Sequence, residues 1–234
     1  MTGKEDPAAF AARRAAARAH IDPLAKRYMG EKGDRRHFFQ AIYDTAGGDA
    51  AGIPWADLEP KKEIADWLGD NPGHGRTALD IACGLGDHAE AIAAAGYRTC
   101  AFDISEKAVA WARQRFPESN VDYRTADLLD LPKSWQTGFD LVNECYTVQS
   151  VPPPLHRRFV EAISSLVAPG GTLLVYARTR PQGGEHEGPP WPLMPSELEF
   201  FRGFGLRRVG EDFFNVNRSD RVVPHVFAVW QRTG

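Results

Sequence analysis

The chain has 234 residues, of which 43% are hydrophobic, and this suits one domain with a large core. Its 28 Lys and Arg against 31 Asp and Glu give a formal net charge of -3, which offers no basic field for a nucleic-acid backbone or an anionic membrane. No apolar stretch reaches the roughly 20 residues that a membrane-spanning helix requires, so we expect a soluble protein with neither partner.

The N-terminal segment is predicted to be helical. Residues 8–20 are rich in Ala and Arg and contain no acid, as transit peptides do. However, Asp6 followed by Pro7 is a typical helix start, and alanine has the highest helix propensity. A plain surface or lid helix is therefore favoured, followed by a second helix near residues 23–29.

A loop with three glycines and a proline at 45–54 follows and leads to Trp55. From Glu59, apolar residues recur at helical spacing until a Gly/Pro-rich stop at 69–73. We expect one domain over residues 1–234, in which 1–58 form a helical lid and 59–234 form the core.

From residue 76, short apolar runs alternate with helical segments, which indicates a parallel sheet built from βαβ units. Pro169, Gly170 and Gly171 are predicted to end a helix before the fifth run. The predicted strands are Thr77–Ile81, Arg98–Phe102, Val121–Thr125, Phe139–Asn143 and Thr172–Ala177.

The C-terminal part has a different pattern. Leu206–Val216 and Val222–Gln231 are predicted to pair as antiparallel strands around a turn at residues 217–220. Between them and the core, residues 179–195 hold too many prolines and glycines for regular structure, which in a compact domain indicates a functional loop.

The most informative segment is ALDIACGLGDHA at residues 78–89, where a strand leads through Asp80 into Gly84 and Gly86 and then into a helix. Glycine allows a sharp turn and a close approach to a ligand, and the helix amides offer it hydrogen-bond donors. This pattern predicts a cofactor-binding turn, with His88 beside it.

Acids follow the neighbouring strands. Asp103 ends the second strand, where it is placed to accept both hydroxyls of an adenosine ribose. Asp127 follows the third strand and Glu144 ends the fourth. Because the carboxyl ends of parallel strands open on one edge of a sheet, we expect Asp80 and these three acids to line a single crevice.

Two cofactors compete for this arrangement. Gly84, Gly86 and Ala89 with Asp103 partly fit a dinucleotide fingerprint, and an NAD-dependent oxidoreductase is one alternative. Asp80 would, however, repel a pyrophosphate, and Asp127 has no role in that fingerprint. S-adenosylmethionine fits better, because its sulfonium and ammonium are cationic and its adenine amine suits Asp127.

These motifs resemble those of class I S-adenosylmethionine-dependent methyltransferases. The resemblance rests on ALDIACGLGDHA, AFDIS, ADL at 126–128, FDLVNECYTVQSVPPP and LVAPGGTLLVYA, and it covers about residues 59–178. It implies an α/β fold with a doubly wound, mostly parallel seven-stranded sheet and an antiparallel C-terminal hairpin. GIPW before EPKKEIADWL is loosely similar to the small-molecule branch that methylates thiopurines, thiols, halides and tellurite.

The resemblance also implies residue roles. Asp80, Gly84 and Gly86 would shape the methionine pocket, and Asp103 would bind the ribose. Ile104 and Leu128 would sandwich the adenine, whose amine would donate to Asp127, and Glu144 and Tyr146 would lie beside the transferable methyl group. Ala82 departs from the family, which usually has glycine there, and this puts the local backbone geometry in doubt.

The acceptor is predicted to be a small molecule with an S, O or N nucleophile. Holding that nucleophile in line with the methyl group supplies much of the acceleration. Where a proton must be removed, the candidate residues are Glu144, Tyr146 and His37. Trp55 is expected to cover the pocket, and Arg178 either meets an anionic substrate or pairs with a loop acid. A non-catalytic S-adenosylmethionine-binding regulator is a further alternative.

Cysteine and histidine spacing predicts no metal site. Cys83, Cys100 and Cys145 are far apart and form no CxxC pair, so we expect free thiols in a reducing cytoplasm. Five histidines are expected to be ordinary surface or helix residues: His20, His74, His156, His186 and His225.

Overall fold

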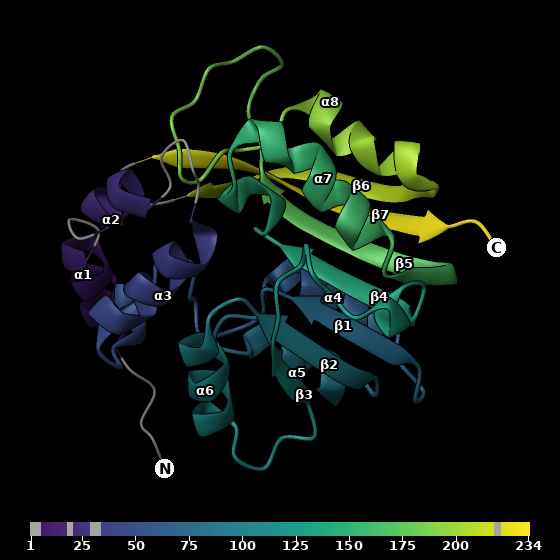
Figure 1. The fold of residues 1–234 in the computed structure, drawn as a ribbon, viewed down its shortest axis with the longest axis horizontal. Coiled ribbons are helices and arrows are strands. Elements are labelled where there is room, and N and C mark those ends of the chain that lie inside the picture. Colours follow the sequence, from purple (N-terminus) through teal and green to yellow (C-terminus); the bar gives the residue numbers. More distant parts are fainter. Residues whose placement is uncertain (1–5, 18–20, 29–33, 218–220) are drawn as a thin grey trace.

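The computed structural model describes residues 6–17, 21–28, 34–217 and 221–234. In this part of the chain, one seven-stranded sheet lies between two layers of helices (Figure 1). The strands are β1 (Thr77–Ile81), β2 (Arg98–Asp103), β3 (Asp122–Thr125), β4 (Phe139–Cys145), β5 (Val167–Arg178), β6 (Leu206–Asn217) and β7 (Val222–Arg232).

Helices cover both faces of the sheet, and the second and third helices also border the edge where the parallel strands end. The described α-helices are α1 (Pro7–Ala17), α2 (Ile21–Tyr28), α3 (Arg35–Ala46), α4 (Lys62–Asp70), α5 (Asp87–Ala94), α6 (Glu106–Arg115), α7 (Pro153–Ser164) and α8 (Pro195–Leu198). Short 3-10 helices lie at Ala50–Gly52, Lys133–Trp135, Val148–Ser150 and Glu199–Phe204.

The strand order is β3-β2-β1-β4-β5-β7-β6. The first five strands are parallel, whereas β7 is antiparallel to both β5 and β6. The order turns back at β1 and β4, and in such sheets ligands bind where the order reverses, beyond the carboxyl ends of the strands. The predicted doubly wound α/β fold with an antiparallel C-terminal hairpin is confirmed.

The two faces of the sheet follow from strand alternation. Leu79 and Val142 lie in one core cluster with α7 and α8, whereas Ala78 and Leu141 lie in another with α4. Because β1 and β4 are covered on both faces, their buried residues are mostly apolar, and the buried polar residues among them are Asp80, Asn143 and Glu144.

Strand boundaries differ from the prediction mainly at β5. This strand begins at Val167 and includes Pro169, Gly170 and Gly171, which the sequence pattern places between helix and strand. Its pairing with β4 shifts between Phe139 and Leu141, so the strand contains an irregularity there and then resumes. The predicted hairpin turn lies mostly outside the described residues, at 218–220.

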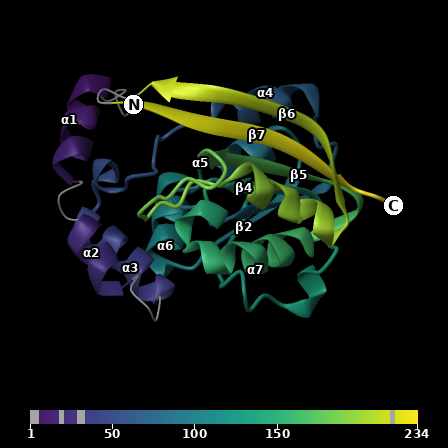
Figure 2. The same ribbon diagram turned by 90° about the horizontal axis from the view of Figure 1, so that it is seen from above.

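The N-terminal helices α1, α2 and α3 group at one end of the sheet (Figures 1 and 2). Ion pairs attach α1 to the segment between α3 and α4, since Arg14 pairs with Asp57 at 2.8 Å and Arg13 with Asp49 at 2.9 Å. None of the helices in the described ranges is both long and apolar enough to cross a lipid bilayer.

Candidate functional site

A cavity of about 510 Å³ opens at the carboxyl ends of β1, β2 and β4. Its walls come from the turns after these strands, from α3 and the loop before α4, and from the segment between β5 and α8. Predicted site residues that line it are Trp55, Ala82, Gly84, His88, Asp103, Ile104, Leu128 and Tyr146.

The turn after β1 has three left-handed residues: Ala82, Gly84 and Gly86 have φ angles of 52°, 54° and 90°. Ala82 therefore keeps the conformation that suits glycine, at an energetic cost. A Cβ on Gly86 would lie 2.4 Å from the Tyr123 hydroxyl, so close packing against β3 also requires glycine there. Together these angles bend the chain sharply between β1 and α5.

Asp103 fixes this turn from the neighbouring strand. Its Oδ2 accepts a hydrogen bond from the Gly84 N–H at 3.0 Å, and its Oδ1 accepts one from the Ser105 N–H at 2.9 Å. Burial raises the pKa of Asp103 to about 6. Each carboxylate oxygen can accept more than one hydrogen bond, so the group can also hold two vicinal hydroxyls in the cavity.

The expectation that four acids line one crevice is wrong for three of them, because only Asp103 reaches the cavity wall. Asp80 is 1% exposed and accepts a 2.7 Å hydrogen bond from Asn143 Nδ2. Its Oδ2 has no hydrogen-bond partner in the described part of the chain, and burial raises the pKa of Asp80 to about 7.

The side chain of Glu144 is directed toward the backbone of the turn that follows β4. Its Oε1 accepts hydrogen bonds from the Thr147 and Val148 N–H groups at 2.7 and 2.9 Å, and burial raises its pKa to about 7. It therefore shapes the turn that carries Tyr146 and does not line the cavity. The two backbone hydrogen bonds explain this, since they hold the carboxylate against residues 147 and 148.

Asp127 is held by α3. Arg35 donates to Asp127 Oδ1 at 3.1 Å, and the Leu129 N–H donates to the same oxygen at 3.0 Å. The cavity wall here consists of the flanking residues Ala126 and Leu128. Leu128 and Ile104 both line the cavity, as a sandwich around a planar ring requires.

His37 lies outside the cavity, because it occupies the first turn of α3 with its side chain 67% exposed. It cannot act on a group inside. His88, by contrast, lines the cavity, and its Nε2 lies 3.2 Å from the Lys61 N–H that donates to it. Burial lowers the pKa of His88 to about 4, which keeps the imidazole neutral.

Aromatic and charged side chains line the part of the cavity that includes Trp55, Tyr146 and Arg178. Trp55 Nε1 donates to the Tyr43 hydroxyl at 3.3 Å, beside Gly84. Lys61 pairs with Asp57, and its Nζ lies 5.0 Å from the centre of the Tyr146 ring. Arg178 also lies against that ring, at 5.7 Å.

The Tyr146 hydroxyl lies 2.8 Å from His225 Nε2. The expectation of an ordinary surface or helix residue at His225 is wrong, because it lies on β7 and is 1% exposed. It has no sequence signal, since its partner is 79 positions away in the chain. Only the reversed direction of β7 brings its first residues to this edge of the sheet.

The segment between β5 and α8 closes one side of the cavity with Pro189 and Pro190. Gln149 anchors it, because its carbonyl accepts the Trp191 N–H at 2.7 Å and its Oε1 accepts the Arg178 N–H at 2.6 Å. The irregular loop predicted at 179–195 thus borders the cavity.

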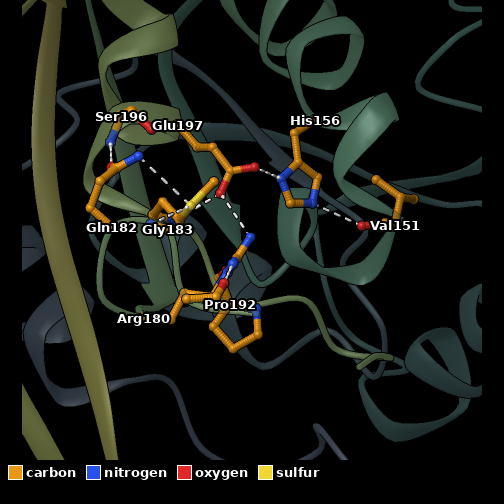
Figure 3. Close-up of polar contacts among 10 residues, drawn as sticks. Val151, His156, Arg180, Gln182, Gly183, Pro192, Ser196 and Glu197 are labelled. Atoms are coloured by element: carbon orange, nitrogen blue, oxygen red, sulfur yellow. Dashed lines mark hydrogen bonds and ion pairs between the residues drawn. The ribbon is translucent and has the colours of Figure 1, made fainter. Parts of the chain in front are cut away.

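A buried network holds the other end of this segment (Figure 3). Glu197 lies between His156, whose Nδ1 is 2.6 Å from Oε1, and Arg180, 3.7 Å from Oε2. His156 also contacts the Val151 carbonyl through Nε2 at 2.8 Å. His156 is a helix residue, as expected, since it lies in α7, but it is fully buried and not on the surface.

Three comparisons with known proteins agree with this geometry. A family model described as a methyltransferase domain matches residues 78–171. The ubiquinone biosynthesis O-methyltransferase of Aromatoleum aromaticum is 37% identical over 123 residues, which cover 50% of this chain and 52% of that protein. The chain thus spans about half the length of the curated relatives it matches.

Solved structures share the fold at low sequence identity. The Burkholderia thailandensis 1,6-didemethyltoxoflavin-N1-methyltransferase has a TM-score of 0.64 and 19% identity, covering 85% of this chain and 87% of that one. The [4+2]-cyclase SpnF has a TM-score of 0.65 and 17% identity, covering 83% and 95%. The same fold therefore carries proteins of different names, and the fold alone does not give the reaction.

Proposed function

Because the chain carries a class I S-adenosylmethionine-dependent methyltransferase domain, we propose that it transfers a methyl group from S-adenosylmethionine to a small-molecule acceptor. The observation that supports this best is the joint geometry of Asp103 and Gly84. A buried carboxylate and a tight left-handed turn meet at the wall of a cavity large enough for a nucleoside.

The residues of the cavity fit this cofactor. Asp103 would hold the ribose hydroxyls, and Ile104 and Leu128 would enclose the adenine. The turn at Ala82 and Gly84 would border the methionine part. Asp80 lies behind this turn, and its buried Oδ2 has no hydrogen-bond partner in the described residues. A cationic group in the cavity would favour the ionised form of Asp80.

We assign supporting roles to the other predicted residues. Gly86 permits the close packing of α5, and His88 and Trp55 border the cofactor from the α4 side. Asp127 reaches the adenine edge only if its contact with Arg35 rearranges. Glu144 acts on the turn after β4, and we assign no role to His37.

When bound, S-adenosylmethionine supplies an electrophilic methyl group on a sulfonium. The protein positions the reacting groups and keeps water away from them. Trp55, Pro189 and Pro190 exclude water, and Tyr146 with Arg178 contacts the acceptor. Aligning nucleophile and methyl carbon in this way is worth about 7–11 kcal/mol in well-oriented intramolecular reactions.

The enclosed cavity favours a small acceptor over a macromolecule. The N-terminal helices and the 179–195 segment serve as the lid, and we propose a cytoplasmic enzyme in keeping with three free cysteines. The curated relatives are O-methyltransferases of ubiquinone biosynthesis by name, so oxygen is the first acceptor atom to test. The looser link to thiopurine, thiol, halide and tellurite methyltransferases stays a prediction.

Cofactor binding and methyl transfer are tested separately. Isothermal titration with S-adenosylmethionine, S-adenosylhomocysteine and NAD should give heat with the first two, whereas binding of NAD alone would contradict the proposal. Incubation with phenols, thiols, amines and halides should then yield S-adenosylhomocysteine and a methylated product. Tight cofactor binding without any product would favour the non-catalytic regulator.

A further inference from the structure

Tyr146 connects the cavity to a buried imidazole. It follows β4, it lines the cavity, and its hydroxyl lies 2.8 Å from His225 Nε2. His225 is 1% exposed and lies near the start of β7. A group in the cavity that contacts the Tyr146 oxygen is therefore one hydrogen bond away from His225.

The second nitrogen of His225 fixes its tautomer. His225 Nδ1 lies 2.8 Å from the Val223 carbonyl oxygen, which can only accept a hydrogen bond. Nδ1 therefore carries a proton, and Nε2 of the neutral ring accepts the hydrogen bond from the Tyr146 hydroxyl. This arrangement leaves Nε2 able to take a proton.

The pair is held in place from several elements. The Phe214 ring of β6 stacks on His225 with an interplanar angle of 19°, and the Tyr176 ring of β5 lies 5.5 Å away. Tyr146 itself adopts a φ angle of 67°, which is uncommon for a bulky residue and costs free energy. The surrounding contacts therefore hold the Tyr146 phenol ring in one orientation.

We propose that Tyr146 and His225 form a proton-accepting pair for acceptors that lose a proton on methylation, namely phenols and other hydroxyl compounds. The inference rests on the proposed methyl transfer. The acceptor oxygen gives its proton to Tyr146 Oη as Tyr146 gives its own proton to His225 Nε2. The oxygen keeps the O–H electron pair for the new bond to the methyl carbon, and the methyl C–S bond breaks with its electron pair left on sulfur. The positive charge of the sulfonium thus ends on the His225 imidazolium.

Cationic side chains border the pair. Lys61 and Arg178 both lie against the Tyr146 ring. Lys61 is itself paired with Asp57. The ring neighbours of His225 that belong to Tyr176 and Phe214 carry no charge. In the proposed cycle, His225 returns its proton through Tyr146 once the products leave.

The substrate class follows from this chemistry. A thiolate or a halide carries no proton that must be removed, so the pair gives it no advantage. A phenol or alcohol carries a proton that must be removed, and general-base catalysis typically raises the rate of such a step by about 10²–10⁴-fold. We therefore assign a hydroxyl acceptor to this site, with Tyr146 in contact with it and His225 acting through Tyr146.

The test compares two acceptor classes in Tyr146→Phe and His225→Gln, with Tyr176→Phe as the matched control. Tyr176→Phe removes a hydroxyl from the same aromatic cluster and should leave all rates within threefold. Both test variants should lower kcat for a phenol by about 10²-fold or more and flatten its pH profile. Their kcat for a thiolate, and their Kd for the cofactor, should change by less than threefold.

An equal loss of kcat on both classes, or no loss on the phenol, would overturn the proposal. Nitrogen-15 NMR gives a readout that needs no methyl transfer, because His225 should show the Nδ1–H tautomer in the free protein. An Nε2–H tautomer would also overturn it. The wild-type protein could bind cofactor and show this tautomer but methylate no acceptor. The proposed function would then be wrong, and there would be no hydroxyl acceptor for the pair to deprotonate.

Discussion

Asp103 accepts a hydrogen bond from the Gly84 N–H at 3.0 Å, so the acid at the end of β2 also shapes the turn after β1. One side chain thus couples two strands to the cavity. Replacing it affects both the turn and any hydroxyls that the carboxylate holds.

Asp103→Asn should weaken S-adenosylmethionine binding by about 10- to 100-fold, since hydrogen bonds to a charged group contribute roughly 1.5–3 kcal/mol. Isothermal titration measures the change. Asp122→Asn is the matched control, because Asp122 is half exposed on β3 and pairs with Arg124. Unchanged affinity in Asp103→Asn would contradict the ribose assignment.

Cofactor affinity should fall in acid. Burial raises the pKa of Asp103 to about 6, so the free protein increasingly protonates this group below pH 6. A protonated carboxyl is a poorer partner for two hydroxyls, and the apparent Kd should rise about tenfold per pH unit below that value. Titrations from pH 5 to 8 check this. Asp103→Asn should show a flatter dependence, and an identical slope would assign the titration to another group.

Ala82→Gly should stabilise the fold. Ala82 has a φ of 52°, and in this left-handed region a Cβ costs an L-residue about 1–2 kcal/mol. Glycine would remove that cost, but the greater freedom of the unfolded glycine chain takes back roughly 0.4–1 kcal/mol. We expect the free energy of unfolding to rise by about 0.5 kcal/mol in urea denaturation. Ala91→Gly in α5 should instead lower it by about 1 kcal/mol. A matching loss in Ala82→Gly would mean that the left-handed angle costs little.

Glu197→Gln should destabilise the protein by about 3 kcal/mol, because it breaks a buried contact with His156. Glu199→Gln, which alters a half-exposed neighbour, should cost less than about 0.5 kcal/mol in the same denaturation experiment. Similar losses in the two variants would indicate that the buried pair adds little.

The Glu197 effect should also depend on pH. Burial raises the pKa of Glu197. The hydrogen bonds from His156 and Met194, together with the charges of His156 and Arg180, outweigh burial and hold this pKa below its ordinary value of 4.5. A lowered pKa gives stability that is present above the ordinary value and lost as the pH falls through the folded value. The difference between wild type and Glu197→Gln should therefore shrink below pH 4.

The central strands β1, β2 and β4 are predictable from sequence because each is a short, mostly apolar run that ends before a turn. Asp103 and Gly84 are predictable for the same reason, since both sit at a strand end beside a turn. Glu144 lies at the predicted strand end, but its direction depends on which face of β4 it occupies. Residue spacing alone does not report that direction.

Residues whose partners are distant in sequence give no signal. His156 depends on Glu197, 41 positions later, and His225 depends on Tyr146. Their burial follows from how α7 and β7 pack, which periodicity alone does not specify. The Arg35 contact with Asp127 has no sequence signal either, because it joins α3 to the loop after β3.

The reversal of β7 sets its first residues beside Arg178 at the cavity wall. In the proposed function, the cofactor half of the cavity is built by β1, β2 and their turns, whereas the opposite wall includes Arg178 at the end of β5, Arg221 just before β7 and the segment before α8. Substitutions in the hairpin can therefore retune acceptor chemistry while the nucleoside side stays intact. A library confined to residues 179–195 and 221–227 is the most direct place to search for new acceptors.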